Sequence, residues 1–77
     1  MDEAYEDAIL RHIAHRGNAG GVSQTSILDY MEGVAPEGEI LNWLLEAEHQ
    51  HLIESMQALA GERRWRITNV GRRGLTA

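Results

Sequence analysis

Hydrophobic residues recur at helical spacing in the first part of the chain. Between Glu3 and Arg16 they fall every three or four positions, and the stripe consists of Tyr5, Ala8, Ile9, His12 and Ile13. Asp2 precedes this segment as a candidate N-cap, and the acidic residues of the first turn suit the positive end of a helix dipole. The pattern predicts an amphipathic helix over residues 3–16.

Two further helices are predicted after a glycine-rich segment at 17–21. Val22 is expected in a short strand, and Ser23 is expected to cap a helix over 24–31. The next helix is expected over 36–50, because proline suits a first helical position. Its apolar side is predicted to hold Ile40, Leu41, Leu44, Leu45 and Ala47. Its outward side is predicted to hold Glu39, Asn42, Trp43 and Glu46.

The pattern changes to alternation in the last third of the chain. One alternating run extends from Leu52 to Leu59, and a second reaches Ile67. The residues between them, Ala60-Gly61-Glu62-Arg63, form a short glycine-containing connection that is typical of a β-hairpin. Thr68 then opens a short turn or helix. Three helices with a hairpin predict an α+β fold.

This succession of elements resembles a winged helix-turn-helix domain, in which helix, short strand, helix, helix and hairpin follow one another. The ending Ile67-Thr68, two residues, then Gly71-Arg72 is similar to the strand that follows the wing in many bacterial and archaeal winged-helix regulators. The resemblance implies a single winged-helix domain over residues 1–77. It also implies a small DNA-binding transcriptional regulator of prokaryotic, archaeal or phage type.

Charge is distributed unevenly along the chain, whose formal net charge is −5. Residues 1–50 carry two Arg and ten Asp or Glu, whereas residues 51–77 carry five Arg and two Glu. All seven basic residues are arginine, which fits coding bias or an acidic proteome from a salty habitat. Arginine also offers forked donors for phosphate or guanine, so the C-terminal third is the candidate for nucleic-acid contact.

The candidate DNA-binding residues are Arg63, Arg64, Arg66, Arg72, Arg73 and Asn42. The resemblance implies that the wing arginines grip the phosphate backbone and that the third helix enters the major groove through Asn42. The arginines could instead pair with acidic helices of the same domain, and Arg72 and Arg73 could belong to a frayed tail. The third helix is acidic for a DNA-reading helix, which counts against groove insertion.

The alternative function is a protein–protein interaction module. In that interpretation the acidic third helix docks a partner with a basic surface through Glu39, Trp43 and Glu46. An exposed tryptophan is a frequent anchor of protein interfaces, but Trp43 could equally pack into the core. Trp65 alternates with Ile67 and is expected in the core.

Other classes of function find little support in the sequence. Four histidines, at 12, 15, 49 and 51, do not match the spacing of a zinc site, so neither a metal nor another cofactor is expected. No nucleophile–base set or phosphate-binding loop is present, so we do not expect an enzyme. There is no cysteine and no apolar run of about 20 residues, so disulfides and a membrane span are not expected either. The cytoplasm is the expected location.

A homodimer is expected from the small size of the domain. Leu10 and Ala14 lie beside the apolar stripe of the first helix and widen it. A domain of this size buries only about 60% of its unfolded surface. Self-association through the first helix or the C-terminal segment would cover more of it.

Overall fold

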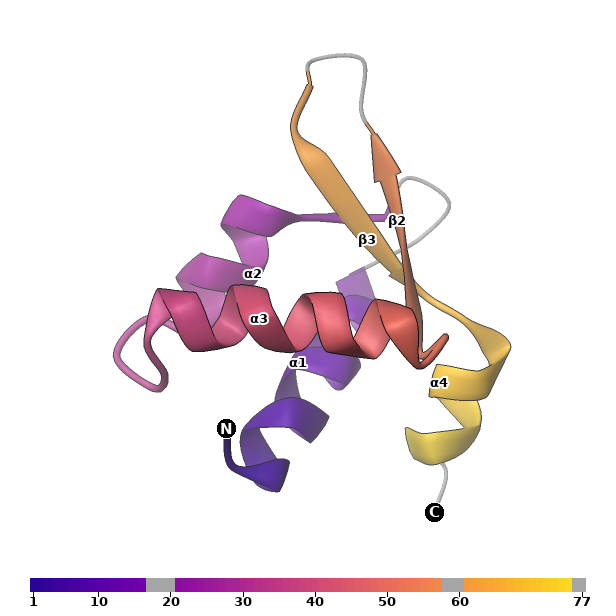
Figure 1. The fold of residues 1–77 in the computed structure, drawn as a ribbon, viewed down its shortest axis with the longest axis horizontal. Helices are drawn as coiled ribbons and strands as arrows, with labels where there is room; N and C mark the ends of the chain where they lie inside the picture. Colours follow the sequence, from indigo (N-terminus) through magenta and orange to yellow (C-terminus); the bar gives the residue numbers. More distant parts are fainter. Residues whose placement is uncertain (17–20, 58–60, 76–77) are drawn as a thin grey trace.

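The computed structural model describes residues 1–16, 21–57 and 61–75, and it has an α+β fold (Figure 1). In chain order the elements are α1 (Glu3–Arg16), β1 (Val22–Ser23), α2 (Gln24–Tyr30), α3 (Glu37–His49), β2 (Ile53–Gln57), β3 (Arg63–Ile67) and α4 (Asn69–Leu75). The three expected helices, the short strand and the hairpin strands are confirmed, whereas Leu59 and Ala60 of the expected hairpin and residues 17–20 of the expected loop lie outside the described residues. The C-terminal turn proves to be a helix of seven residues.

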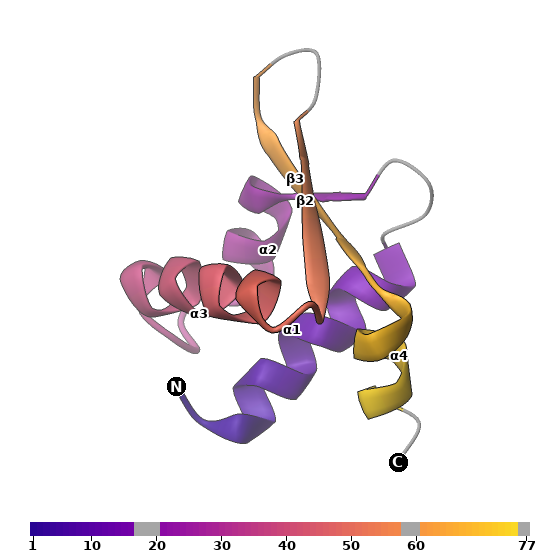
Figure 2. The ribbon, with the colours of Figure 1, turned by 45° about the vertical axis from the view of Figure 1, so that its right-hand side comes forward.

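The three strands form one antiparallel sheet in the order β1-β3-β2. Val22 of β1 lies opposite Trp65, and on the other side of β3 Ile53 lies opposite Ile67. Because side chains alternate along a strand, Trp65 and Ile67 share one face and Arg64 and Arg66 share the other. Figures 1 and 2 show the β2–β3 hairpin projecting beyond the helices.

The core lies where the helices pack on the base of this sheet. Its buried side chains come from every element before α4: Ile9, Ile13, Val22, Ile27, Met31, Ile40, Trp43, Leu44, Ala47, Ile53, Trp65 and Ile67. Leu10, Ala14, Leu52 and Leu75 pack against its edge. The stripe that widens α1 is therefore partly covered within the domain itself.

Local capping explains where the helices begin. The Ser23 hydroxyl accepts a hydrogen bond from the Ser26 N–H at 3.2 Å, which confirms Ser23 as the N-cap of α2. The Thr68 hydroxyl accepts from the Gly71 N–H at 3.1 Å and caps α4 in the same way. Pro36 is the N-cap of α3 and not its first residue, and α2 ends at Tyr30, one residue before the expected end.

The C-terminus of α3 turns directly into the hairpin. His51 adopts a left-handed backbone conformation with φ of 65°. Its N–H donates to the Glu48 carbonyl, and the Leu52 N–H donates to the Ala47 carbonyl. These two bonds are the Schellman pattern, which glycine usually completes. Because histidine stands at that position, the sequence did not signal the motif.

Three orientations differ from expectation. The buried positions of α3 are Ile40, Trp43, Leu44 and Ala47. Their spacing of three, one and three residues places Trp43 inside the stripe, and it is only 7% exposed. Its placement on the outward side was wrong, and the core alternative holds. Leu45 falls outside the stripe and is 52% exposed, and Tyr5 at the edge of α1 is 39% exposed.

Candidate functional site

Alternation along β3 divides the hairpin arginines between two faces. Arg63 lies on the same face as Trp65, and its guanidinium carbon is 5.6 Å from the centre of the indole ring. Arg64 and Arg66 lie on the opposite face, away from the core. The three residues therefore do not form a single patch.

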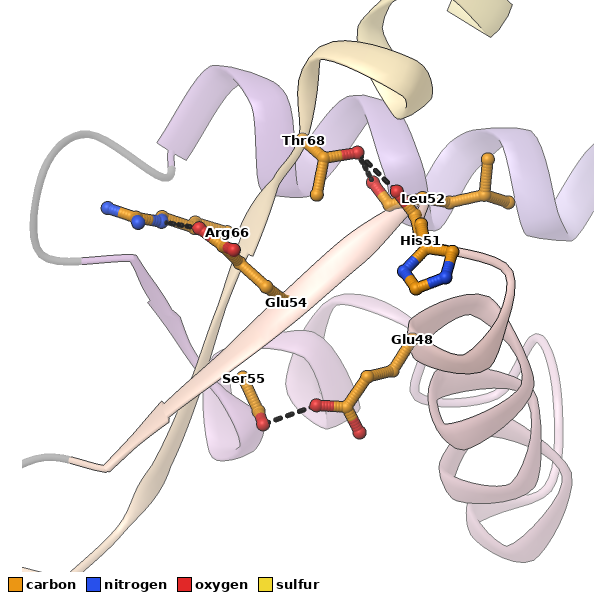
Figure 3. Close-up of polar contacts among 7 residues, drawn as sticks. All are labelled: Glu48, His51, Leu52, Glu54, Ser55, Arg66 and Thr68. Atoms are coloured by element: carbon orange, nitrogen blue, oxygen red, sulfur yellow. Dashed lines mark hydrogen bonds and ion pairs between the residues drawn. The ribbon is translucent and has the colours of Figure 1, made fainter.

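Two of these arginines have partners within the chain. Arg64 donates from Nη2 to the carbonyl oxygen of Gly21 at 2.8 Å, which ties β3 to the start of β1. Arg66 forms an ion pair with Glu54, its cross-strand neighbour, and both side chains remain about half exposed (47% and 49%). Figure 3 shows this pair on the hairpin face opposite Ser55 and Glu48. An exposed pair of this kind is weak, so Arg66 can exchange Glu54 for another anion.

The start of β3 is attached to α2 through Glu62. Its carboxylate accepts hydrogen bonds from the hydroxyl of Thr25 at 2.6 Å and from the Thr25 N–H at 3.3 Å. These hydrogen bonds, together with the nearby charge of Arg64, hold the pKa of Glu62 below its ordinary value. Glu62 therefore carries its negative charge at neutral pH and lowers the local potential of the hairpin arginines.

Arg72 and Arg73 lie exposed on α4. This helix is held at the base of the hairpin, because Thr68 donates its N–H to the carbonyl of Leu52 at 3.1 Å. The Thr68 hydroxyl also donates to the carbonyls of His51 and Leu52 (Figure 3). The two arginines are therefore on an ordered helix and not on a frayed tail.

The outward side of α3 has the opposite charge. Glu39, Asn42 and Glu46 are exposed as expected, together with Leu45. The helix contains no Lys or Arg between Glu37 and His49. Glu48 is turned toward the sheet, where it accepts a hydrogen bond from the Ser55 hydroxyl at 2.5 Å (Figure 3). The α3 face is consequently negative, with one large apolar side chain.

A groove of about 700 Å³ lies between the N-terminal half of α1, the C-terminal half of α3 and α4. We call it the acidic groove. Its acidic lining residues are Asp2, Glu3, Glu6, Asp7 and Glu46, and its apolar lining includes Leu10, Trp43 and Leu52. The sequence analysis missed this site, because the acidic first turn of α1 already had an explanation in the helix dipole. The lining of the groove joins residues more than 40 positions apart in sequence, and no local motif links them.

The acidic groups of this groove differ in their contacts. The Asp2 carboxylate accepts from the Ala4 N–H as the expected cap, and Asp7 pairs with Arg11 at 2.7 Å. The carboxylates of Glu3, Glu6 and Glu46 make no hydrogen bond or ion pair with the residues that the structure describes. Three negatively charged side chains without a hydrogen-bond or ion-pair partner among the described residues therefore line one groove.

The histidines do not gather into a site. His12 stacks on Tyr30 with ring centres 4.2 Å apart, and its Nε2 lies 3.3 Å from the Ser26 hydroxyl. Burial lowers the pKa of His12, and the neighbouring charge of Arg16 lowers it further. Within residues 1–16, 21–57 and 61–75, no group of three His, Asp or Glu residues is placed to hold a metal ion.

Comparison with known proteins gave no match to a family model, a curated protein or a solved structure. None of the helices in the described part of the chain is both long and apolar enough to cross a membrane. The function of the chain is therefore argued from its own residues.

Proposed function

We propose that this chain is a winged helix-turn-helix domain. The order of the elements supports this assignment, because two helices and a short strand precede α3 and a two-stranded hairpin follows it. So does the sheet order, in which β1 pairs with β3 and leaves the hairpin projecting as a wing (Figure 2). In such domains α3 corresponds to the groove-reading helix and the β2–β3 hairpin to the wing.

We propose further that the domain binds DNA through this wing, as a small transcriptional regulator. The observation that carries the proposal is the exposure of Arg63 and Arg66 on a hairpin that projects beyond the helices. A projecting arginine reaches a phosphate without bringing the acidic helices close to the duplex. Arg72 and Arg73 add positive charge at the base of the same hairpin.

The acidic α3 implies a particular mode of binding. Glu39 and Glu46 flank Asn42 on the exposed side of α3, so pressing this helix into the major groove would bring carboxylates toward phosphates. The wing and α4 then supply most of the affinity, and Asn42 supplies at most a single base contact. Such binding is strongly dependent on salt and weakly dependent on sequence.

Binding of a fluorescent duplex at about 50 and 200 mM salt tests this proposal. The informative variant is Arg63→Gln with Arg66→Gln, because Arg64 also anchors Gly21 and its loss would disturb the fold. We expect weaker binding to every duplex and a salt slope reduced by about 0.9 for each lost phosphate contact. The matched control is Arg11→Gln with Arg16→Gln, two arginines of α1.

The proposal fails if the wild type does not bind DNA at the lower salt concentration. It also fails if the two double variants lose affinity equally, because the effect would then reflect net charge alone.

A second candidate function is a protein-interaction module that uses the acidic side of α3. The observation that favours it is the charge of the outward α3 face, which holds Glu39 and Glu46 and no Lys or Arg. A negative face with an exposed leucine suits a partner that has a basic surface and an apolar contact. Trp43 serves such an interface from the floor of the acidic groove and not as a projecting anchor.

A further inference from the structure

We infer that the acidic groove binds an extended segment of a partner protein in which arginine or lysine alternates with an apolar residue. This inference rests on the second proposed function and places its binding site at the edge of α3 that faces α1. It differs from the proposed DNA contact, which uses the hairpin with Arg72 and Arg73 of α4, although Gly74 of α4 also lines the groove.

The charge of the groove selects the sign of the ligand. Glu3, Glu6 and Glu46 line it without partners among the described residues. Negative charges along one groove attract a cationic ligand and repel an anionic one. A phosphate backbone is anionic, so nucleic acid is not the occupant.

The apolar floor selects the kind of cation. Leu10, Trp43 and Leu52 line the groove beneath the carboxylates. Exposed ion pairs alone contribute little to affinity, whereas covering apolar side chains contributes in proportion to the area removed from water. A segment that offers both a basic and an apolar side chain therefore fits better than a purely basic one.

The indole N–H of Trp43 has no hydrogen-bond acceptor among the described residues, which favours a ligand that offers a main-chain carbonyl. Trp43 is only 7% exposed, and no described residue accepts a hydrogen bond from its Nε1. Trp65 differs in this respect. Among the described residues, its Nε1 is the side-chain nitrogen or oxygen that is both fully buried and without a hydrogen-bond partner. The Trp43 N–H therefore keeps contact with solvent, and Trp43 lines the groove. A peptide carbonyl is an acceptor that every extended segment carries.

The size of the groove agrees with such a ligand. About 700 Å³ lies within the range of cavities that hold a drug-sized molecule. That space takes a few residues of an extended chain.

The test uses the full chain and a fluorescein-labelled peptide of sequence Arg-Leu-Arg-Arg-Leu-Arg, followed by fluorescence anisotropy at low salt. The groove variant is Glu3→Gln, Glu6→Gln and Glu46→Gln. The matched control, Glu32→Gln, Glu37→Gln and Glu39→Gln, removes three charges from exposed glutamates outside the groove, and it includes Glu39 of the outward α3 face so that this competing surface is tested as well. We expect the groove variant to weaken binding about tenfold and the control to weaken it less than about threefold. Melting temperatures verify that both variants fold.

Two further measurements examine the floor of the groove. Replacing both leucines of the peptide by glycine is expected to weaken binding at least about fivefold, because the apolar contact is lost. In a nitrogen-15 spectrum, the peptide is expected to shift the indole N–H signal of Trp43 and to leave that of Trp65 in place. The Trp43→Phe variant identifies which signal is which.

The outcomes separate this inference from the function on which it rests. If the control variant loses more affinity than the groove variant, the outward α3 face is the partner surface, so the module survives and the groove inference is overturned. If the two variants lose affinity equally, or the peptide does not bind at low salt, binding by the acidic side is not specific and both fail. An unchanged Trp43 signal on a bound peptide overturns the placement in the groove.

Discussion

The β2–β3 hairpin and the acidic groove use charge in opposite ways. On the hairpin, Arg64 bonds to a main-chain carbonyl, Arg66 pairs with Glu54 and Arg63 lies over Trp65. In the groove, three of the five acidic side chains have no partner among the described residues. A count of charges along the sequence therefore overestimates how readily the hairpin arginines can bind a ligand, and it underestimates how readily the carboxylates of the groove can.

The difference has a physical origin in the two kinds of secondary structure. Cross-strand neighbours lie close together in a sheet, so an arginine on β3 meets the residue opposite it on β2. Glutamates on two separate helices have no such obligatory neighbour. A charged residue on a hairpin is therefore more often committed locally than one that lines a groove between helices.

The largest expected effect comes from Gly71→Ala on α4, the helix that packs against the base of the hairpin and also borders the groove. A Cβ at this position would overlap the main-chain carbonyl oxygen of Leu52 and crowd the side chain of Ile67. Either α4 moves away or the end of β3 shifts, and we expect a loss of about 1–3 kcal/mol in the free energy of unfolding. Urea denaturation measures it. Gly74→Ala is the control, because a Cβ there meets nothing within 4 Å. An equal loss in both variants would contradict the close approach of α4 to Leu52.

A gain in stability is expected from His51→Gly, at the junction of α3 with the hairpin. His51 holds φ at 65°, which disfavours a side chain, whereas glycine adopts it readily. We expect the free energy of unfolding to rise by up to about 1 kcal/mol, less the entropy that glycine adds to the unfolded chain. Thermal unfolding followed by circular dichroism measures the shift. His49→Gly, inside α3, should instead destabilise, and a loss in the His51 variant would argue against the left-handed turn.

A smaller effect is expected when Arg66 is released from its partner. Glu54→Gln removes the ion pair and should cost less than about 1 kcal/mol of stability, because both side chains are half exposed. If the wing binds DNA, the same change should strengthen binding and steepen its dependence on salt. Duplex binding checks both, with Glu32→Gln as a control of equal charge. Weaker binding by the Glu54 variant would mean that Arg66 does not contact phosphate.

The smallest effect concerns pH and lies outside both regions. Because the pKa of His12 is lowered in the folded chain, the unfolded chain takes up the proton more readily. The contribution of His12 is therefore fully present above pH 6.5, the ordinary histidine value, and is lost as the pH falls below it. Urea unfolding at about pH 7.5 and pH 5 should show a smaller loss in His12→Gln than in the wild type. Identical losses in His12→Gln and in the wild type would exclude this role of His12.

Most of the fold was predictable, because its signals are local. The N-cap Ser23, the stripe of α1 and the alternation toward Ile67 depend on residues a few positions apart. Trp43 was assigned to the wrong side of α3, although the spacing of Ile40, Trp43, Leu44 and Ala47 already marks one helical stripe. Leu45 lies on a second apolar edge beside that stripe, and packing within the domain decides that this edge stays exposed.

The candidate site was less predictable than the fold. The sequence indicated the arginines as candidates but not their partners within the chain. The register that places Glu54 opposite Arg66 depends on how the strands pair. The groove joins both ends of the chain with α3, so its existence follows from tertiary packing alone.

The homodimer stays a prediction, and the structure gives it less support than the sequence did. Leu10 and Ala14, which were to extend the stripe of α1 into a contact, already pack against the core of their own domain. Light scattering at high micromolar concentration measures the mass directly.

The closure of the hairpin at its base has a consequence for how this fold can vary. The carbonyl of Leu52 accepts hydrogen bonds from both the N–H and the hydroxyl of Thr68, so the residues just before and just after the hairpin are joined. We call these two hydrogen bonds the clasp. Side chains alternate with a period of two residues, so adding or removing two residues in each strand near its outer end, beyond the clasp, keeps every core side chain on its face. The reach of the hairpin is thus a dimension that mutation can lengthen or shorten independently, while the three-helix body beneath it keeps its packing.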